Sequence, residues 1–158
     1  MKLYCVRHGH AEQSPNTNGE RPLTQKGIEE INRIAMYLAH RDIRIVHVMH
    51  SGKLRAQQSA VVLAEAVAKD QLVEICELLG SDYPTAPLIG RIQEWHDDTL
   101  LVGHMPFMSQ LVSSLILGSN YPDILLFPPA TVVCLERFQN RWILNWVLRP
   151  DLVPDKIE

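Results

Sequence analysis

Short apolar segments alternate with longer amphipathic segments along most of the chain. The short segments cover residues 2–7, 45–50, 72–76 and 99–102, and each is followed by a turn or helix signal. The longer segments cover residues 25–40, 53–68, 84–95 and 106–117. Such alternation predicts buried parallel strands that are connected by helices.

The last part of the chain has a different pattern. Residues 131–138 and 141–148 are β-rich, and Gln139-Asn140 between them is a hairpin signal. We therefore predict an α/β fold, a three-layer α/β/α sandwich with a mostly parallel central sheet and a C-terminal antiparallel hairpin. With 158 residues, the chain is expected to form one domain over residues 1–158.

Composition narrows the classes of function. The chain is 46% hydrophobic and has a formal net charge of −3, which argues against binding to nucleic acid or to a membrane surface. No apolar run approaches the roughly 20 residues that span a bilayer, and no signal peptide precedes the first strand. Cys5, Cys76 and Cys134 lack metal-ligand spacing. We expect reduced thiols and a cytoplasmic protein.

Three strand-to-helix junctions carry candidate chemistry. Arg7-His8-Gly9 ends the first predicted strand, Arg55 lies in the first turn of the helix after the second, and Gly103-His104 follows the fourth. Ligands of open α/β sheets bind at the carboxyl ends of the strands, so one edge would gather all three. An imidazole beside a guanidinium group is kept neutral and nucleophilic, and a helix N-terminus with an arginine favours phosphate.

Each of these residues also has a simpler interpretation. A strand-end histidine often bonds only a backbone carbonyl, a helical arginine is often solvated, and a histidine at a helix start often has only a local partner. Two histidines and two arginines at one predicted edge are nevertheless explained better by one anion site than by separate local roles.

In this order and spacing, the motifs resemble those of the histidine phosphatase superfamily, which includes the cofactor-dependent phosphoglycerate mutases. The matching segments are Arg7-His8-Gly9, Arg21-Pro22-Leu23-Thr24 with Gly27, Ser51 with Leu54-Arg55-Ala56-Gln57, and Gly103-His104. The resemblance spans residues 1–117, and among branches it is greatest to the bacterial SixA-type phosphohistidine phosphatases. Gly52 departs from the pattern, because the family usually has proline after the serine.

The resemblance implies a role for each matching residue. His8 would be the nucleophile that becomes phosphorylated, and Arg7, Arg55 and His104 would hold the phosphoryl oxygens. Gly9 and Ser51 would contribute to phosphate binding. No cofactor is implied, and no carboxylate–histidine cluster in the sequence has the spacing of a metal site.

A general acid is harder to assign. Larger members of the superfamily use a carboxylate, and Glu77 is the best placed one here, ahead of Asp82 and Glu12. A solvated loop charge is the simpler interpretation of Glu77. A phosphoimidazole makes less demand on a positioned acid than an alcohol, and the chain is too short for a large capping insertion. We therefore predict that the substrate is a phosphohistidine on a protein, either a phosphorelay transfer domain or a phosphocarrier.

Two other functions fit the same residues. A small-molecule phosphomonoesterase or phosphoglycerate mutase-like enzyme would share the chemistry, although only Arg21 and Lys53 are candidates for binding a second phosphate. A non-catalytic module that binds phosphorylated proteins would share the fold, but such proteins typically lack the nucleophile or one arginine. A nucleotide-binding domain is unsupported, because neither a dinucleotide fingerprint nor a Walker-type loop is present.

Overall fold

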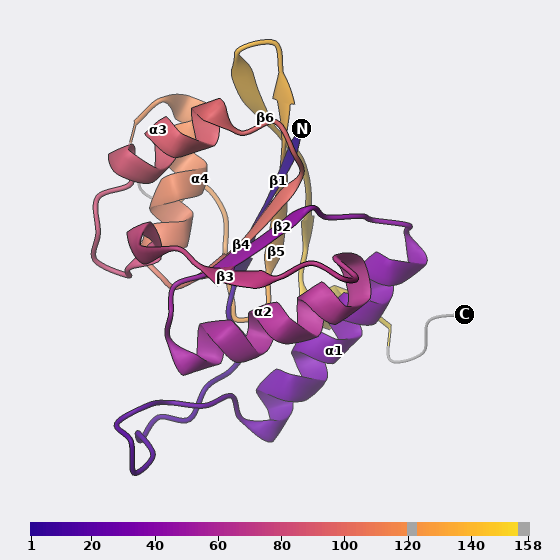
Figure 1. Cartoon of the computed structure of the whole chain (residues 1–158), viewed down its shortest axis with the longest axis vertical. Coiled ribbons are helices and arrows are strands. Elements are labelled where there is room, and N and C mark those ends of the chain that lie inside the picture. Colours follow the sequence, from indigo (N-terminus) through magenta and orange to yellow (C-terminus); the bar gives the residue numbers. More distant parts are fainter. Residues whose placement is uncertain (120–122, 155–158) are drawn as a thin grey trace.

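The computed structural model describes residues 1–119 and 123–154, which form one six-stranded sheet flanked by helices (Figure 1). The strands are β1 (Lys2–Arg7), β2 (His47–His50), β3 (Val73–Ile75), β4 (Thr99–Gly103), β5 (Val132–Phe138) and β6 (Arg141–Leu148). The α-helices are α1 (Gln25–His40), α2 (Leu54–Val67), α3 (Ala86–Glu94) and α4 (Phe107–Leu117). Two short 3₁₀ helices complete the described elements: η1 (Glu77–Leu79) follows β3, and η2 (Pro150–Leu152) follows β6.

The strand order in the sheet is β3-β2-β4-β1-β5-β6. The first four strands of the chain pair in parallel, and β5 is antiparallel to both β1 and β6. The predicted fold class is confirmed, including the C-terminal hairpin. The third strand is shorter than predicted, and the second begins later because Ile45 and Val46 donate to the Val67 and Asp98 carbonyls.

Helices cover both faces of the sheet, and each face has its own core. Tyr4 and Val6 of β1 pack with α1 and α2 on one face, whereas Leu3 and Cys5 pack with α3 and α4 on the other. None of these four side chains is more than 2% exposed. Burial on both faces explains why the parallel strands are apolar throughout instead of alternating with polar residues.

Local signals in the sequence set the start and packing of the first two helices. The Thr24 hydroxyl accepts a hydrogen bond from the Gly27 N–H at 3.0 Å, which satisfies a free donor at the start of α1. Ile31 and Ile34 then face the core, and the small residue Ala60 of α2 is fully buried in the same cluster. Among the described residues, no helix is long and apolar enough to cross a bilayer.

The register of the parallel strands places their carboxyl ends side by side. Arg7 of β1 lies opposite Gly103 of β4, and His50 of β2 lies opposite Val102 of the same strand. The backbone N–H of His8 donates to the Gly103 carbonyl at 3.1 Å, which continues the pairing one residue past β1. The residues that follow β1, β2 and β4 therefore meet at one edge of the sheet.

Candidate active site

That edge brings together the residues that the sequence singled out. The rings of His8 and His104 lie 4.9 Å apart between centroids, with their planes at 56°. Arg55, in the first turn of α2, places its Nε 3.3 Å from His8 Nε2. Ser51, directly after β2, has its Oγ 2.5 Å from His104 Nε2. Ser51, Arg55 and the two histidines thus form one contiguous group.

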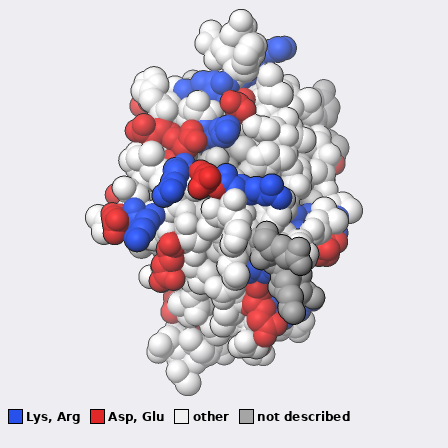
Figure 2. Space-filling model, turned by 90° about the vertical axis from the view of Figure 1, so that its right-hand side faces the viewer, with Lys and Arg blue, Asp and Glu red and all other residues white. Residues whose placement is uncertain are grey.

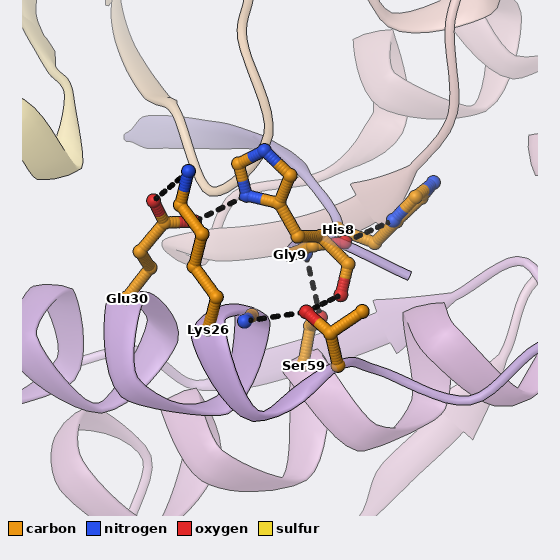
Figure 3. A network of polar contacts seen from close by, with 8 residues as sticks. His8, Gly9, Lys26, Glu30 and Ser59 are labelled. Carbon is orange, nitrogen blue, oxygen red and sulfur yellow. Dashed lines mark hydrogen bonds and ion pairs between the residues drawn. The ribbon is translucent and has the colours of Figure 1, made fainter. Parts of the chain in front are cut away.

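A short hydrogen bond determines the tautomer of His8. Its Nδ1 lies 2.6 Å from the carbonyl oxygen of Gly9, and Figure 3 shows the ring turned toward that oxygen. Because a carbonyl oxygen can only accept, Nδ1 carries the proton and Nε2 keeps its lone pair. The Arg55 Nε–H donates to this lone pair. An anion bound to Arg55 would therefore lie next to the unprotonated nitrogen of His8.

Arg7 reaches the same edge and still has donors available. Its Nη1 donates to the Phe127 carbonyl at 2.9 Å, in the segment between α4 and β5. Arg7 Nε and His104 Nδ1 are buried and have no hydrogen-bond partner among the described residues. Buried polar nitrogens in proteins normally have partners, so these two are available to the oxygens of an anion.

Burial is the main reason why His8 is neutral at physiological pH. It lowers the pKa of His8 to about 4, and the positive charges of Arg55, Arg7 and Arg21 add to this effect. The hydrogen bond to Gly9 acts in the opposite direction without outweighing the others. At neutral pH Nε2 is therefore unprotonated, and its lone pair can attack an electrophile once an anion takes over the hydrogen bond from Arg55.

The same causes act on His104 and on the arginines. Burial lowers the pKa of His104 to about 3, with further contributions from His8, Arg55 and Lys53. Burial also lowers the pKa of the Arg7 and Arg55 guanidinium groups, and for Arg55 the charge of Arg21 adds to the effect. The charged groups that act most strongly on the two imidazoles are all cationic, so the pocket attracts anions.

This positive character is local. The chain has a net charge of −3, and the face drawn in Figure 2 carries basic side chains next to acidic ones without a continuous basic region. The described residues contain no group of three or more His, Cys, Asp or Glu side chains that could hold a metal ion. An anion is thus attracted by the strand ends and not by the field of the whole molecule.

The predicted carboxylates make no bond to this group among the described residues. Glu77 begins η1 beyond β3, and β3 is separated from β1 by two strands, a distance of about 14 Å at the usual strand spacing. Glu77, Asp82 and Glu12 are exposed. In the described parts of the chain, no hydrogen bond or ion pair connects their carboxylates with His8 or His104. None of the three carboxylates is therefore bonded to either histidine in the described residues.

Comparisons with known proteins identify the family to which this chain is similar. A model of the histidine phosphatase superfamily (branch 1) matches residues 3–79, from β1 through η1. The phosphohistidine phosphatase SixA of Escherichia coli (strain K12) is 25% identical over 154 residues, which are 95% of this chain and 94% of that protein. The chain belongs to the histidine phosphatase superfamily. The matched residues include Arg7, His8, Ser51 and Arg55.

Solved structures share the fold over almost the whole chain. A structure of the protein histidine phosphatase SixA complexed with tungstate matches with a TM-score of 0.83 and 22% identity, covering 96% of this chain and 98% of that chain. A phosphoglycerate mutase from Bacillus anthracis matches with a TM-score of 0.74 and 14% identity, covering 97% and 95%. The comparisons support a phosphatase of this superfamily.

Ser59, which the sequence motifs did not single out, joins two parts of the site. Ser59 is fully buried, and its Oγ accepts from the Gly9 N–H at 3.1 Å (Figure 3). The same Oγ donates to the Arg55 carbonyl at 2.8 Å. It thereby links α2 to the loop after β1. Arg21 Nε donates to the Glu12 carbonyl at 2.6 Å. The sequence signal for Ser59 was a serine on the core-facing side of α2. Arg21 belongs to a predicted motif, but its bond to the Glu12 carbonyl depends on the folded loop.

Gly27 allows α1 to start directly against the loop that holds His8. A Cβ atom at Gly27 would lie 2.1 Å from the carbonyl oxygen of His10, which also accepts from the Thr24 N–H at 2.9 Å. The carbonyl oxygen of His10 is a backbone atom, so it cannot move away from an added Cβ atom as a flexible side chain could. We expect Gly27→Ala to lower the free energy of unfolding by about 2–3 kcal/mol, measured by urea denaturation.

Gly90 in α3 is a matched control for this substitution. A Cβ atom at Gly90 meets nothing within 4 Å, so Gly90→Ala should raise the free energy of unfolding by about 0.5–1 kcal/mol through helix propensity alone. Equal stability of the two alanine variants would show that the close approach of α1 to the His8 loop is not needed.

The lowered pKa of His104 makes the stability of the protein depend on pH. Below its ordinary pKa of 6.5, the unfolded chain binds a proton that the folded chain does not take up until pH about 3. The contribution of His104 is therefore complete above pH 6.5 and is lost as the pH falls, by about 1.4 kcal/mol per pH unit. We expect His104→Gln to lose less stability than wild type between about pH 7 and about pH 5 in urea denaturation.

His47 supplies the control for this prediction. It is exposed at the start of β2, with its Nε2 3.6 Å from an Asp97 carboxylate oxygen. His47→Gln should leave the pH dependence of unfolding close to that of wild type. An unchanged pH dependence in His104→Gln would contradict the account of the buried neutral imidazole.

Proposed function

We propose that this protein hydrolyses phosphohistidine on a protein substrate and that His8 is the residue that is transiently phosphorylated. The observation that carries the proposal is the lone pair of His8 Nε2, which faces Arg55 Nε at 3.3 Å beside the ring of His104. A lone pair next to a phosphate-binding cation suits in-line attack on phosphorus. The name of the E. coli relative, a phosphohistidine phosphatase, supports the choice of substrate.

The first step transfers the phosphoryl group to the enzyme. The Nε2 lone pair of His8 forms a bond with phosphorus, and the bond from phosphorus to the imidazole nitrogen of the substrate breaks. The other ring nitrogen of the substrate imidazole has taken a proton from solvent, so the leaving nitrogen keeps the electron pair and the ring departs as a neutral imidazole. Arg7, Arg55 and His104 bind the phosphoryl oxygens and stabilise the charge that develops on them.

The Gly9 carbonyl has a specific role in this step. The ring of His8 gains positive charge when Nε2 bonds to phosphorus. The Gly9 oxygen, 2.6 Å from Nδ1, accepts the hydrogen bond that favours the charged ring, as shown by its upward effect on the pKa of His8. This contact therefore stabilises the phosphorylated form more than the free form.

The second step releases phosphate. A water molecule attacks the phosphorus, its proton passes to solvent, and the bond from phosphorus to His8 Nε2 breaks with the electron pair returning to the ring. The products are inorganic phosphate and the neutral imidazole. We propose that no metal ion takes part in either step.

The position of Glu77 favours a nitrogen leaving group. An alcohol leaves with a high pKa and needs a proton from a positioned acid, a contribution of about 10²–10⁴-fold in rate. A phosphorylated imidazole leaves readily once its ring is protonated. With Glu77 beyond β3 and without a hydrogen bond to His8, the site is better suited to phosphohistidine than to a phosphomonoester.

A comparison of substrates tests the proposal. The kcat/KM for a histidine-phosphorylated transfer domain should exceed those for 3-phosphoglycerate and a sugar phosphate by at least about 10²-fold. Glu77→Gln should change the rate on the phosphorylated domain by less than about threefold, because no acid is positioned for it.

Each contrary result has a separate meaning. Faster turnover of a phosphomonoester would overturn the substrate assignment while leaving the role of His8 intact. Binding of the phosphorylated domain without turnover of any substrate would favour the non-catalytic binding module instead.

A further inference from the structure

Two exposed apolar side chains flank the cationic pocket. Leu126, in the segment before β5, is 77% exposed, and Ile75, at the carboxyl end of β3, is 65% exposed. A single exposed apolar residue is common on protein surfaces and needs no explanation. These two are notable for their position, because each adjoins a residue of the site.

Leu126 is held next to Arg7 on an anchored segment. The carbonyl of the following residue, Phe127, accepts from Arg7 Nη1 at 2.9 Å, and the Phe127 side chain is buried. At the other end of the segment, the Asp123 carboxylate accepts a hydrogen bond from Ser109 of α4. The backbone is therefore tied down on both sides of Leu126, whose side chain is left in solvent.

Ile75 lies on the opposite side of the pocket. Its Cγ2 is 3.6 Å from where a Cβ atom of Gly52 would be, and Gly52 directly follows Ser51, the partner of His104. Ile75 ends β3, and the Leu126 segment is bound to Arg7 at the end of β1; these two strands are separated by β2 and β4, a distance of about 14 Å at the usual strand spacing. A phosphorylated side chain alone cannot contact both, whereas the surface of a folded protein can.

We propose that Leu126 and Ile75 form a docking surface for the folded protein that presents the phosphohistidine. This inference rests on the proposed function. The charges of the site support the choice of partner: the pocket between the two side chains is cationic, and Lys53 and Arg21 add to its positive charge. The partner therefore presents a phosphoryl anion at its centre and apolar surface around it.

Two substrates of different size separate docking from chemistry. The probes are a histidine-phosphorylated transfer domain and free phosphohistidine, which fills the pocket without reaching its rim. For Leu126→Asp and for Ile75→Asp, we expect the KM for the phosphorylated domain to rise about tenfold, with kcat little changed. Turnover of free phosphohistidine should stay within about twofold of wild type, which also shows that the variants fold.

Leu72→Asp is the matched control. Leu72 is 82% exposed, but it precedes β3 and therefore lies at the amino edge of the sheet, away from the pocket. The Leu72→Asp variant should have the same KM as wild type for both probes. The proposed docking surface would be wrong if Leu126→Asp and Ile75→Asp left the KM for the domain unchanged. It would also be wrong if these variants lost activity equally on the domain and on free phosphohistidine. If wild type turns over free phosphohistidine but not the domain, the proposed function fails and the docking surface with it.

Discussion

His8→Asn is expected to lower kcat for phosphohistidine hydrolysis by about 10⁴-fold or more. The asparagine amide can still donate to the Gly9 carbonyl that now accepts from His8 Nδ1, so the loop after β1 should keep its position. What the variant lacks is the lone pair at Nε2, and without it no covalent intermediate can form. Single-turnover kinetics with a labelled phosphohistidine protein would measure the loss.

The residual rate of this variant discriminates between mechanisms. Arg7, Arg55 and His104 remain in His8→Asn and can still bind the phosphoryl group, so binding of the substrate should persist. His47→Ala, at the opposite edge of the sheet, should retain full activity. A rate for His8→Asn within about tenfold of wild type would mean that water attacks the substrate directly, which would contradict covalent catalysis.

Arg55→Lys should lower kcat by about 10²–10³-fold although it keeps the positive charge. Arg55 presents a planar fork of donors, and its Nε–H lies 3.3 Å from His8 Nε2. Lysine offers a point charge on a flexible stem and cannot hold a phosphoryl group and the imidazole in a single orientation. Arg149→Lys, where the guanidinium pairs with exposed Asp151, is the matched control and should retain full activity.

Removing the positive charge of Arg55 should also change the pH dependence of kcat/KM. The nucleophile is neutral His8, so activity falls as the pH drops through its pKa, which lies at about 4 in the folded protein. Arg55 lowers that pKa, so Arg55→Gln should raise it and move the acid limb of kcat/KM to higher pH. Since burial is the larger cause, the limb should stay below 6.5. A shift toward lower pH would contradict the assignment.

The fold could be predicted because each strand–helix unit has a strong local pattern. The helix α1 begins and ends at the predicted residues, where Thr24 caps its start. Strand β3 was harder to delimit, because it pairs only with β2 at the edge of the sheet and Glu74 and Ile75 are exposed. Its ends are set by tertiary pairing and not by a local pattern.

The residues of the site likewise include some that a local sequence pattern predicts and others that depend on tertiary packing. His8, Arg55 and His104 could be found because each follows a strand whose end must lie at one edge. The partners that orient them could not, since the Phe127 carbonyl and the Ser59 hydroxyl reach Arg7 and Gly9 only through packing of distant segments. The position of Glu77 relative to His8 likewise depends on strand order, which the local pattern does not determine.

Trapping the phosphorylated enzyme tests the central claim most directly. Wild-type protein would be mixed briefly with a labelled phosphohistidine protein, quenched in base, and digested for mapping of acid-labile phosphate. Label on Nε2 of His8 in wild type, with none in His8→Asn, is the predicted result. Label on any other residue, or turnover without label on His8 at times shorter than one catalytic cycle, would contradict the proposed mechanism.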